Sequence, residues 1–410
     1  MLEKKSSVKL NILDFLLILI ILYTVAPIVS RFISSYLTTY VYMLVIVAAV
    51  ALLLLCKGMK SINDCILMLA PFLAWKLMAF FMVKGDLVTW GYGALLDLVP
   101  ILAGYYMMNC CNDDKNKFFM WLVIAVFAIT LITTVIGCIQ HEGAARYLAT
   151  VENANEAKAV LYGWLNLGGY QFVYMVVLLH PIVVLAYKKG KIKKWVAIVC
   201  SVAVFLLAIY SEYTTALLLT LFTCVLYFFK KDLKPKQLIG LTIAVIAVFT
   251  VFSELFSNFL NWLADIIGSD TIALRLKALA GGRTGIENSE DDRIVLYEAS
   301  LRTFFNNPLL GTFLSGGGVG GGHSFILDFA AQFGIVGIAL LVYMYRTIYK
   351  FAFAKYKGRE GYGYILWIFL QTLLLSAVNT GMWLSVLTLF VPILLRMIYA
   401  EEKNENLMDR

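Results

Sequence analysis

The sequence predicts an all-α, polytopic membrane protein with about twelve transmembrane helices and one large helical external loop. Hydrophobic residues make up 61% of the 410 residues and charged residues only 15%, a composition that ordinary soluble domains do not have. The apolar runs are long and continuous, whereas the strands of a membrane β-barrel would alternate apolar and polar residues. The clusters of Lys and Arg fall on alternate loops, as the positive-inside rule requires.

At roughly 20 residues a span, we predict a single integral membrane domain over residues 1–410. The expected helices cover residues 12–30, 39–56, 64–83, 90–108, 118–140, 160–187, 194–210, 213–230, 237–254, 324–350, 361–378 and 381–400. The tight turns at 210–214 and 379–382 leave open a merged or re-entrant pair. The first run is too long for a signal-peptide core, so we expect an uncleaved span. An even number of spans places both termini on the same side of the membrane, and the basic clusters make that side the cytoplasm.

The longest polar stretch, residues 255–323, is predicted to be an external loop inserted between the ninth and tenth spans. Apolar residues recur in it at helical spacing, which predicts short amphipathic helices on the bilayer face. One helix is expected to begin at Ser289, where residues 289–292 resemble a capping box with acids in the first turn. Residues 306–308 should end it. Its expected apolar face consists of Ile294, Tyr297, Leu301, Phe304 and Phe305.

This loop closes on six glycines between residues 316 and 322, followed directly by His323. Glycines allow positive φ and close approach of a ligand to the backbone, and exposed amides near a helix start favour anions. An imidazole at this position could act as a general base. The alternative is a flexible connector that carries an unrelated histidine. The glycines predicted to contact a ligand are Gly317, Gly318, Gly320, Gly321 and Gly322.

Charged residues supply the other candidates. The guanidinium groups of Arg283, Arg293 and Arg302 could pair bidentately with phosphate oxygens, or could balance the acids of the same loop. Lys76 and Asp97 lie inside predicted spans, where an ion needs a partner, and we expect them to pair with each other. No carboxylate cluster or zinc-type cysteine spacing indicates a metal or another cofactor. His180 is expected to bond to backbone carbonyls freed by the following proline.

The residues between 293 and 337 resemble a known family. Arg293, Ser300-Leu301, Pro308-Leu309-Leu310-Gly311, the glycine run, His323-Ser324-Phe325-Ile326-Leu327 and Gly334-Ile335-Val336-Gly337 are similar to the O-antigen polymerase and ligase superfamily of bacterial envelope glycosyltransferases. The resemblance implies a GT-C-like glycosyltransferase architecture. It also implies that an arginine and a histidine of the large external loop lie on either side of a lipid-pyrophosphate sugar donor.

The resemblance implies a polymerase that joins oligosaccharide repeats carried on undecaprenyl pyrophosphate into an O-antigen, capsule or exopolysaccharide. It would act at the outer face of a bacterial cytoplasmic membrane as a metal-independent, inverting enzyme without a cofactor. His323 and Arg293 would be catalytic. The expected partners are the lipid-linked oligosaccharide, the bilayer and a chain-length regulator, with no nucleic acid. Two alternatives remain: a ligase that transfers finished polymer to an acceptor, and a polytopic transporter or lipid-oligosaccharide flippase.

The sequence departs from the family pattern at three places. Ser324 and Gln332 stand where the family usually has Asn and Glu. Residues 213–216, Tyr-Thr-Thr-Ala, lack the arginine of the Ser-Arg-Thr-Ala-like motif that normally opens an earlier span. Arg146, Lys158 or a loop cation would then have to supply the missing contact with phosphate.

Overall fold

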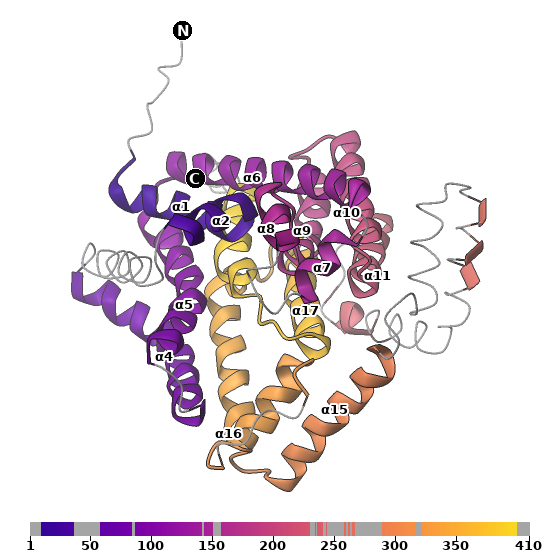
Figure 1. The fold of residues 1–410 in the computed structure, drawn as a ribbon. Coiled ribbons are helices and arrows are strands. Elements are labelled where there is room, and N and C mark those ends of the chain that lie inside the picture. Colours follow the sequence, from indigo (N-terminus) through magenta and orange to yellow (C-terminus); the bar gives the residue numbers. More distant parts are fainter. Residues whose placement is uncertain are drawn as a thin grey trace.

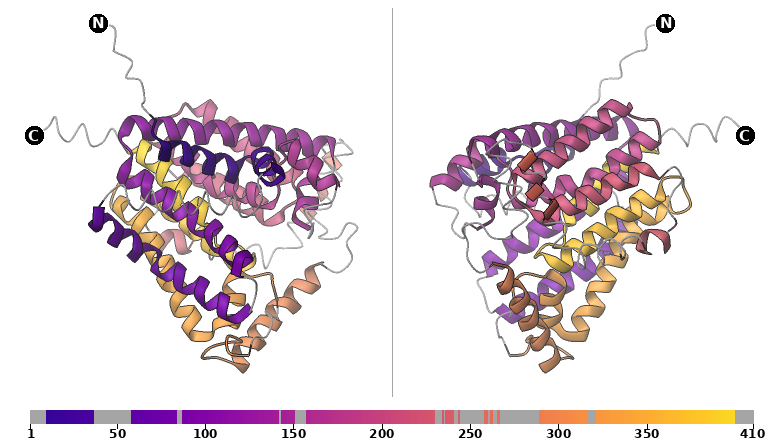
Figure 2. Two further views of the ribbon diagram at one scale, coloured as in Figure 1. Left: turned by 60° about the vertical axis from the view of Figure 1, so that its left-hand side comes forward. Right: turned by 90° about the vertical axis from the view of Figure 1, so that its right-hand side faces the viewer.

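The computed structural model describes residues 10–36, 58–83, 87–141, 143–150, 157–229, 289–315 and 321–399, with short pieces between 234 and 266. This part of the chain is helical throughout and contains no strand. Figures 1 and 2 show helix α6 lying across one end of the molecule, while α15 and the lower part of α16 form the opposite end. The predicted all-α class is confirmed.

The N-terminal apolar run forms two helices instead of one span. Helix α1 covers Ile12–Val25 and α2 covers Pro27–Tyr36, and their axes are bent by 108°. Proline has no N–H to continue the helix, and it pushes the residue before it out of the α region. Ala26 accordingly has extended backbone angles. The single span predicted over 12–30 is therefore corrected to a broken pair.

Three long helices follow, close to their predicted positions. Helix α4 covers Gly58–Val83, α5 covers Leu87–Cys110 and α6 covers Asp113–Gln140. The side-chain oxygen of Asn112 accepts a hydrogen bond from the N–H of Lys115 at 3.0 Å, which caps the start of α6. The helix α1 packs against both α5 and α6.

The predicted span 160–187 is also broken. Helices α7 (Ala144–Thr150) and α8 (Ala157–Trp164) are short, and α9 begins only at Tyr170 and ends at Lys188. Asn166 turns the chain between α8 and α9 with a φ of +56°. Its side-chain amide donates to Thr130 at 3.1 Å and accepts from the N–H of Ile28 at 3.2 Å. These bonds to α6 and α2 hold a conformation that asparagine tolerates better than most residues.

The next helices form the packed centre of the molecule. Helices α10 (Lys194–Tyr210) and α11 (Thr214–Val225) pack on α9, and a short 3₁₀ turn, η1 (Leu226–Phe228), follows. Helix α9 is buried along almost its whole length. The tight turn predicted at 210–214 is confirmed as a break between α10 and α11.

In the C-terminal part, the predicted loop helix packs onto an apolar helix. Helix α15 covers Ser289–Asn306, as predicted, and packs along α16, Phe325–Ile348. Two short turns, η2 (Tyr349–Phe353) and η3 (Ala354–Tyr356), precede α17 (Tyr362–Val378). After the turn at 379–384, η4 (Ser385–Phe390) and α18 (Val391–Ile398) complete the fold. Of the predicted apolar face, Leu301 and Phe305 are 40% and 71% exposed.

Within the described ranges, three helices are long and apolar enough to cross a membrane, or four if the bent pair α1 and α2 counts as one span. Five more apolar helices are shorter. The predicted span 39–56 and most of 237–254 lie outside the described residues, as do most residues of the amphipathic helices expected before residue 280. Apolar helices of this kind indicate association with a membrane. The number of twelve spans stays a prediction.

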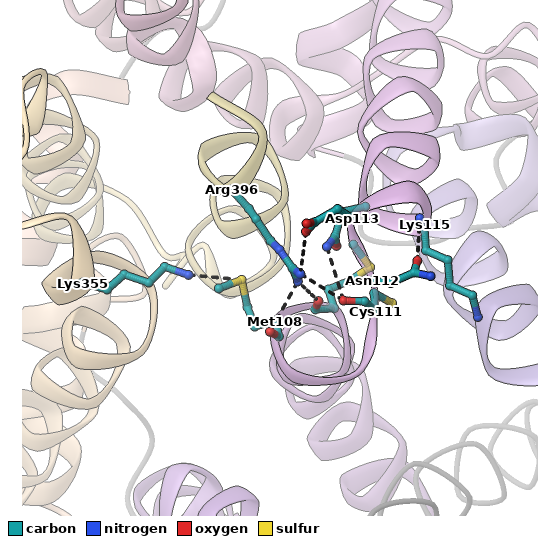
Figure 3. A network of polar contacts seen from close by, with 9 residues as sticks. Met108, Cys111, Asn112, Asp113, Lys115, Lys355 and Arg396 are labelled. Atoms are coloured by element: carbon teal, nitrogen blue, oxygen red, sulfur yellow. Dashed lines mark hydrogen bonds and ion pairs between the residues drawn. The ribbon is translucent and has the colours of Figure 1, made fainter. Parts of the chain in front are cut away.

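A polar network joins four helices at the end of the molecule where α6 lies (Figure 3). The guanidinium of Arg396, on α18, donates to the carbonyl oxygens of Met107 at 2.9 Å and Cys111 at 3.0 Å, and pairs with Asp113 at 3.1 Å. A cation at a helix C-terminus satisfies carbonyls that have no partner inside the helix. Lys115, in the first turn of α6, forms an ion pair with the fully buried Asp14 of α1.

Lys76 of α4 and Asp97 of α5 form the ion pair that the sequence predicts. Reversing either charge, in Lys76→Glu or Asp97→Lys, should place two like charges together and lower the melting temperature of the purified protein. The double variant restores opposite charges and should recover most of the loss. Thermal melting in detergent measures all three. A double variant no more stable than the singles would show that this pair does not hold α4 to α5.

Candidate active site

His323 lies directly in front of α16, and its side chain is exposed. The next residue, Ser324, is the N-cap of α16: its backbone is extended, and its hydroxyl oxygen accepts from the N–H of Leu327 at 3.1 Å. A serine in this position satisfies one of the N–H groups that the first turn of a helix leaves without a partner. The expectation that the histidine opens this apolar helix is confirmed.

The carboxylate of Asp328 fixes the backbone on both sides of His323. Its Oδ1 atom accepts from the N–H of Gly322 at 3.2 Å, and its Oδ2 atom accepts from the N–H of Ser324 at 3.1 Å. The hydroxyl of Ser300, on α15, donates to Oδ1 at 2.6 Å. Asp328 is only 9% exposed, and bonds to an ionised acceptor are stronger than neutral ones. The imidazole is therefore presented on a fixed turn.

Helix α15 supports the same turn. Besides the bond from Ser300, the hydroxyl of Tyr297 donates to the carbonyl oxygen of Val378 at 3.0 Å. Gly321 touches α15 so closely that a Cβ would lie 2.4 Å from the carbonyl oxygen of Leu296. Gly322 has a φ of +75°, which favours glycine. Gly321, in the described end of the glycine run, is thus packed against α15, while the choice between a ligand loop and a flexible connector stays open.

Arg293 lies in α15, where the structure describes its backbone. Its side chain lies outside the described residues. Because it precedes Ser300 by seven residues, or two helical turns, both positions share the face of α15 that meets Asp328. The two Cα positions are separated by about 10 Å along the axis. Position 293 thus shares a face of α15 with Ser300, and the meeting of the Arg293 guanidinium with the imidazole of His323 stays a prediction.

Two sequence motifs, residues 308–311 and 334–337, contact each other at the kink of α16. Inside α16, Gly334 interrupts the helix with a φ of +60°, and the turn after α15 packs into this kink. The N–H of Ile335 donates to the carbonyl oxygen of Pro308 at 2.8 Å. A Cβ on Gly311 would lie 2.3 Å from the carbonyl oxygen of Ala331, so only glycine fits there. The segments 308–311 and 334–337 thus form one contact that fixes the turn against α16.

Arg146 lies on α7, near the hydroxyl of Tyr213. A chain of contacts leads from Tyr213 to the head of α16. The ring of Tyr213 packs on that of Tyr170 at 5.6 Å, and Tyr170 packs on Trp383 at 5.8 Å. The turn containing Trp383 reaches α16, because the carbonyl oxygen of Asn379 accepts from the N–H of Phe325 at 2.9 Å.

The remaining predicted ligands are not brought to His323 by the described structure. Arg302 points away on the exposed side of α15 and pairs with Glu298 at 2.6 Å, one turn earlier. The N–H of Gly322 is already donated to Asp328, so it is not available to an anion here. Gly317, Gly318, Gly320 and Arg283 lie outside the described residues.

His180 behaves differently from the prediction. Its Nε2 atom lies 2.8 Å from the hydroxyl oxygen of Ser201 on α10, and that hydroxyl lies 2.9 Å from the hydroxyl of Tyr227. The ring thus bonds to a side chain of the neighbouring helix instead of the carbonyls freed by Pro181. The side chain of a helical residue points outward, so the imidazole meets groups of the adjacent helix more readily than the carbonyl oxygens of its own helix.

Sequence reasoning missed Asp328. A signal was present, because it is the single carboxylate in the apolar run 324–350, where an ionised group is costly unless bonded. Within the described ranges no three His, Cys, Asp or Glu residues lie together as a metal site would require.

No family model matches the chain, and no curated protein matches it. The resemblance between residues 293 and 337 and the polymerase and ligase superfamily therefore remains an expectation. The case for a function has to come from the geometry around His323.

Proposed function

We propose that the protein is a membrane glycosyltransferase that polymerises lipid-pyrophosphate-linked oligosaccharide repeats into a surface polysaccharide. The observation that carries this proposal is the exposed imidazole of His323 at the head of an apolar helix, on a turn whose flanking N–H groups, from Gly322 and Ser324, bond to Asp328. A fixed, exposed base at the end of a membrane helix suits a substrate whose lipid lies in the bilayer and whose reacting group lies at its surface. The family resemblance supports the same reaction.

In the proposed reaction, His323 accepts the proton of the acceptor sugar hydroxyl as its oxygen attacks the anomeric carbon of the donor. The new bond joins that carbon to the acceptor oxygen, and the bond to the pyrophosphate oxygen breaks. Direct displacement inverts the anomeric centre. Arg293, on the face of α15 that meets Asp328, neutralises the charge that develops on the departing pyrophosphate. Arg146 is the candidate for the second phosphate contact.

The proposal includes a membrane arrangement. Twelve spans place both termini in the cytoplasm of a bacterium and the segment 255–323 on the outer face of the cytoplasmic membrane, as the alternating basic loops favour. The undecaprenyl chain would then remain in the outer leaflet while its oligosaccharide meets His323. A protein that regulates chain length is the further partner expected.

Reconstitution tests this function. The purified protein in liposomes, supplied with an undecaprenyl-pyrophosphate oligosaccharide, should join repeats and release free undecaprenyl pyrophosphate, which gel electrophoresis and mass spectrometry detect. Accumulation of single-repeat lipid intermediates in a deletion strain would agree with polymerisation. Accumulation of long, unattached polymer would point to ligation, and movement of the lipid across the liposome without any joining would point to transport. Either of the last two results would overturn the proposal.

A further inference from the structure

The turn between α17 and η4 contains two buried donors that have no acceptor in the described part of the chain. Trp383 is 8% exposed, and its indole Nε1 has no hydrogen-bond partner among the described residues; the same holds for the side-chain Nδ2 of Asn379. Most buried polar groups in folded proteins are bonded, because an unsatisfied donor loses its bonds to water and gains nothing in return. Two such donors four residues apart require an explanation.

The backbone of the same turn is also unusual. Trp383 has a φ of +55°, although tryptophan rarely adopts positive φ. Gly381 lies against its indole ring, and a Cβ there would lie 3.1 Å from the ring. Strained conformations of this kind persist where the surrounding structure enforces them, and they cluster at ligand sites. Opening this turn would relieve the strain and let both donors find acceptors.

Aromatic rings surround the indole. The ring centroid of Trp383 lies 5.8 Å from that of Tyr170 and 5.5 Å from that of Tyr174, and Tyr213 packs on both tyrosines at 5.6 Å. Tyr170 and Tyr213 are half-buried, so part of this aromatic surface is accessible. The cluster adjoins the candidate active site through the bond from Phe325 to Asn379, two residues after His323.

We propose that Asn379, Trp383, Tyr170 and Tyr213 form a subsite for one pyranose ring of the oligosaccharide, an inference that rests on the proposed function. A pyranose has an apolar C–H face, which suits an aromatic surface, and hydroxyl oxygens at its edge, which accept from N–H donors. A polyprenyl chain has no acceptors for these donors. When the turn opens, the indole and amide donors bond to sugar hydroxyls beside the imidazole of His323.

Trp383→Phe tests the subsite, because it removes the N–H and keeps an aromatic ring. The matched control is Trp367→Phe: Trp367 is also buried, but its indole N–H already donates to the hydroxyl oxygen of Thr223 at 3.2 Å. Both substitutions remove buried ring atoms, but only Trp367→Phe also breaks a hydrogen bond, so Trp367→Phe should lower the melting temperature more than Trp383→Phe does.

Binding is measured by saturation-transfer NMR on the full chain in lipid nanodiscs. The probes are the methyl pyranosides of glucose, galactose, mannose, rhamnose and N-acetylglucosamine. At least one should receive saturation from the wild-type protein, with an affinity about tenfold weaker for Trp383→Phe and unchanged for Trp367→Phe. No transfer to any probe, or equal affinity for Trp383→Phe, would overturn the subsite.

The same variants separate this inference from the proposed function. If His323→Ala abolishes joining while Trp383→Phe binds sugar normally, the subsite is wrong and the glycosyltransferase survives. If sugar binding depends on Trp383 while His323→Ala still polymerises at the wild-type rate, the subsite stands and the proposed mechanism fails.

Discussion

His323→Ala should lower the rate of polymer formation by at least about 100-fold, because a positioned general base contributes roughly 10²–10⁴ to the rate of proton transfer. The side chain is exposed, so its removal should change the free energy of unfolding by less than about 0.5 kcal/mol. On the reconstituted protein, release of undecaprenyl pyrophosphate measures the reaction rate, and thermal melting measures the stability. A wild-type rate in a well-folded His323→Ala protein would remove His323 from the mechanism.

His141→Ala provides a matched control, since His141 lies outside the site, at the C-terminal end of α6, and its loss should leave the rate unchanged. Asp328→Asn provides a graded variant. The amide retains one acceptor oxygen but loses the charge that strengthens the bonds from Ser300, Gly322 and Ser324. We therefore expect a kcat between those of the wild type and His323→Ala, with KM unchanged because Asp328 positions the base without meeting the substrate.

The sequence was most informative where local chemistry decides the structure. Helix α10 has the predicted bounds, 194–210, and α15 begins at Ser289 and ends at Asn306 as predicted. Capping residues, acids in the first turn and a following proline are properties of a few adjacent residues. The ion pair between Lys76 and Asp97 was predictable for a related reason, because two ions in apolar surroundings require each other.

Features that depend on distant residues were not predictable. The break at Asn166 depends on its hydrogen bond with Thr130 of α6. Asn166 alone does not lower the hydropathy of the run 160–187 enough to reveal a turn. In the candidate site, the histidine and glycines could be found from spacing, but Ser300 and Asp328 meet only after α15 folds onto α16. The unbonded donors at Asn379 and Trp383 are a property of packing alone, since any tryptophan in a sequence has an N–H.

The other large effect concerns stability at the opposite end of the molecule. Asp14→Ala should lower the free energy of unfolding by about 3–5 kcal/mol, because removing one member of a buried ion pair leaves the other unpaired. Asp14 is fully buried and pairs with Lys115. It also accepts from the hydroxyl of Tyr106 at 2.9 Å and from the N–H of Asn11 at 2.8 Å. Unfolding in detergent, followed by circular dichroism, measures the change.

Two further variants separate the buried pair from a general effect of charge. Asp113→Ala removes a neighbouring acid whose side chain is 84% exposed in its pair with Arg396, and pairs exposed in this way add little to stability. In the double variant Asp14→Leu with Lys115→Leu, no charge is left without a partner, so much of the loss should be recovered. If Asp113→Ala were as destabilising as Asp14→Ala, or if the double variant were worse than both singles, the connection between α1 and α6 would not depend on this ion pair. The expected difference between the two variants follows from burial, because water can replace the exposed carboxylate of Asp113 but cannot reach Asp14.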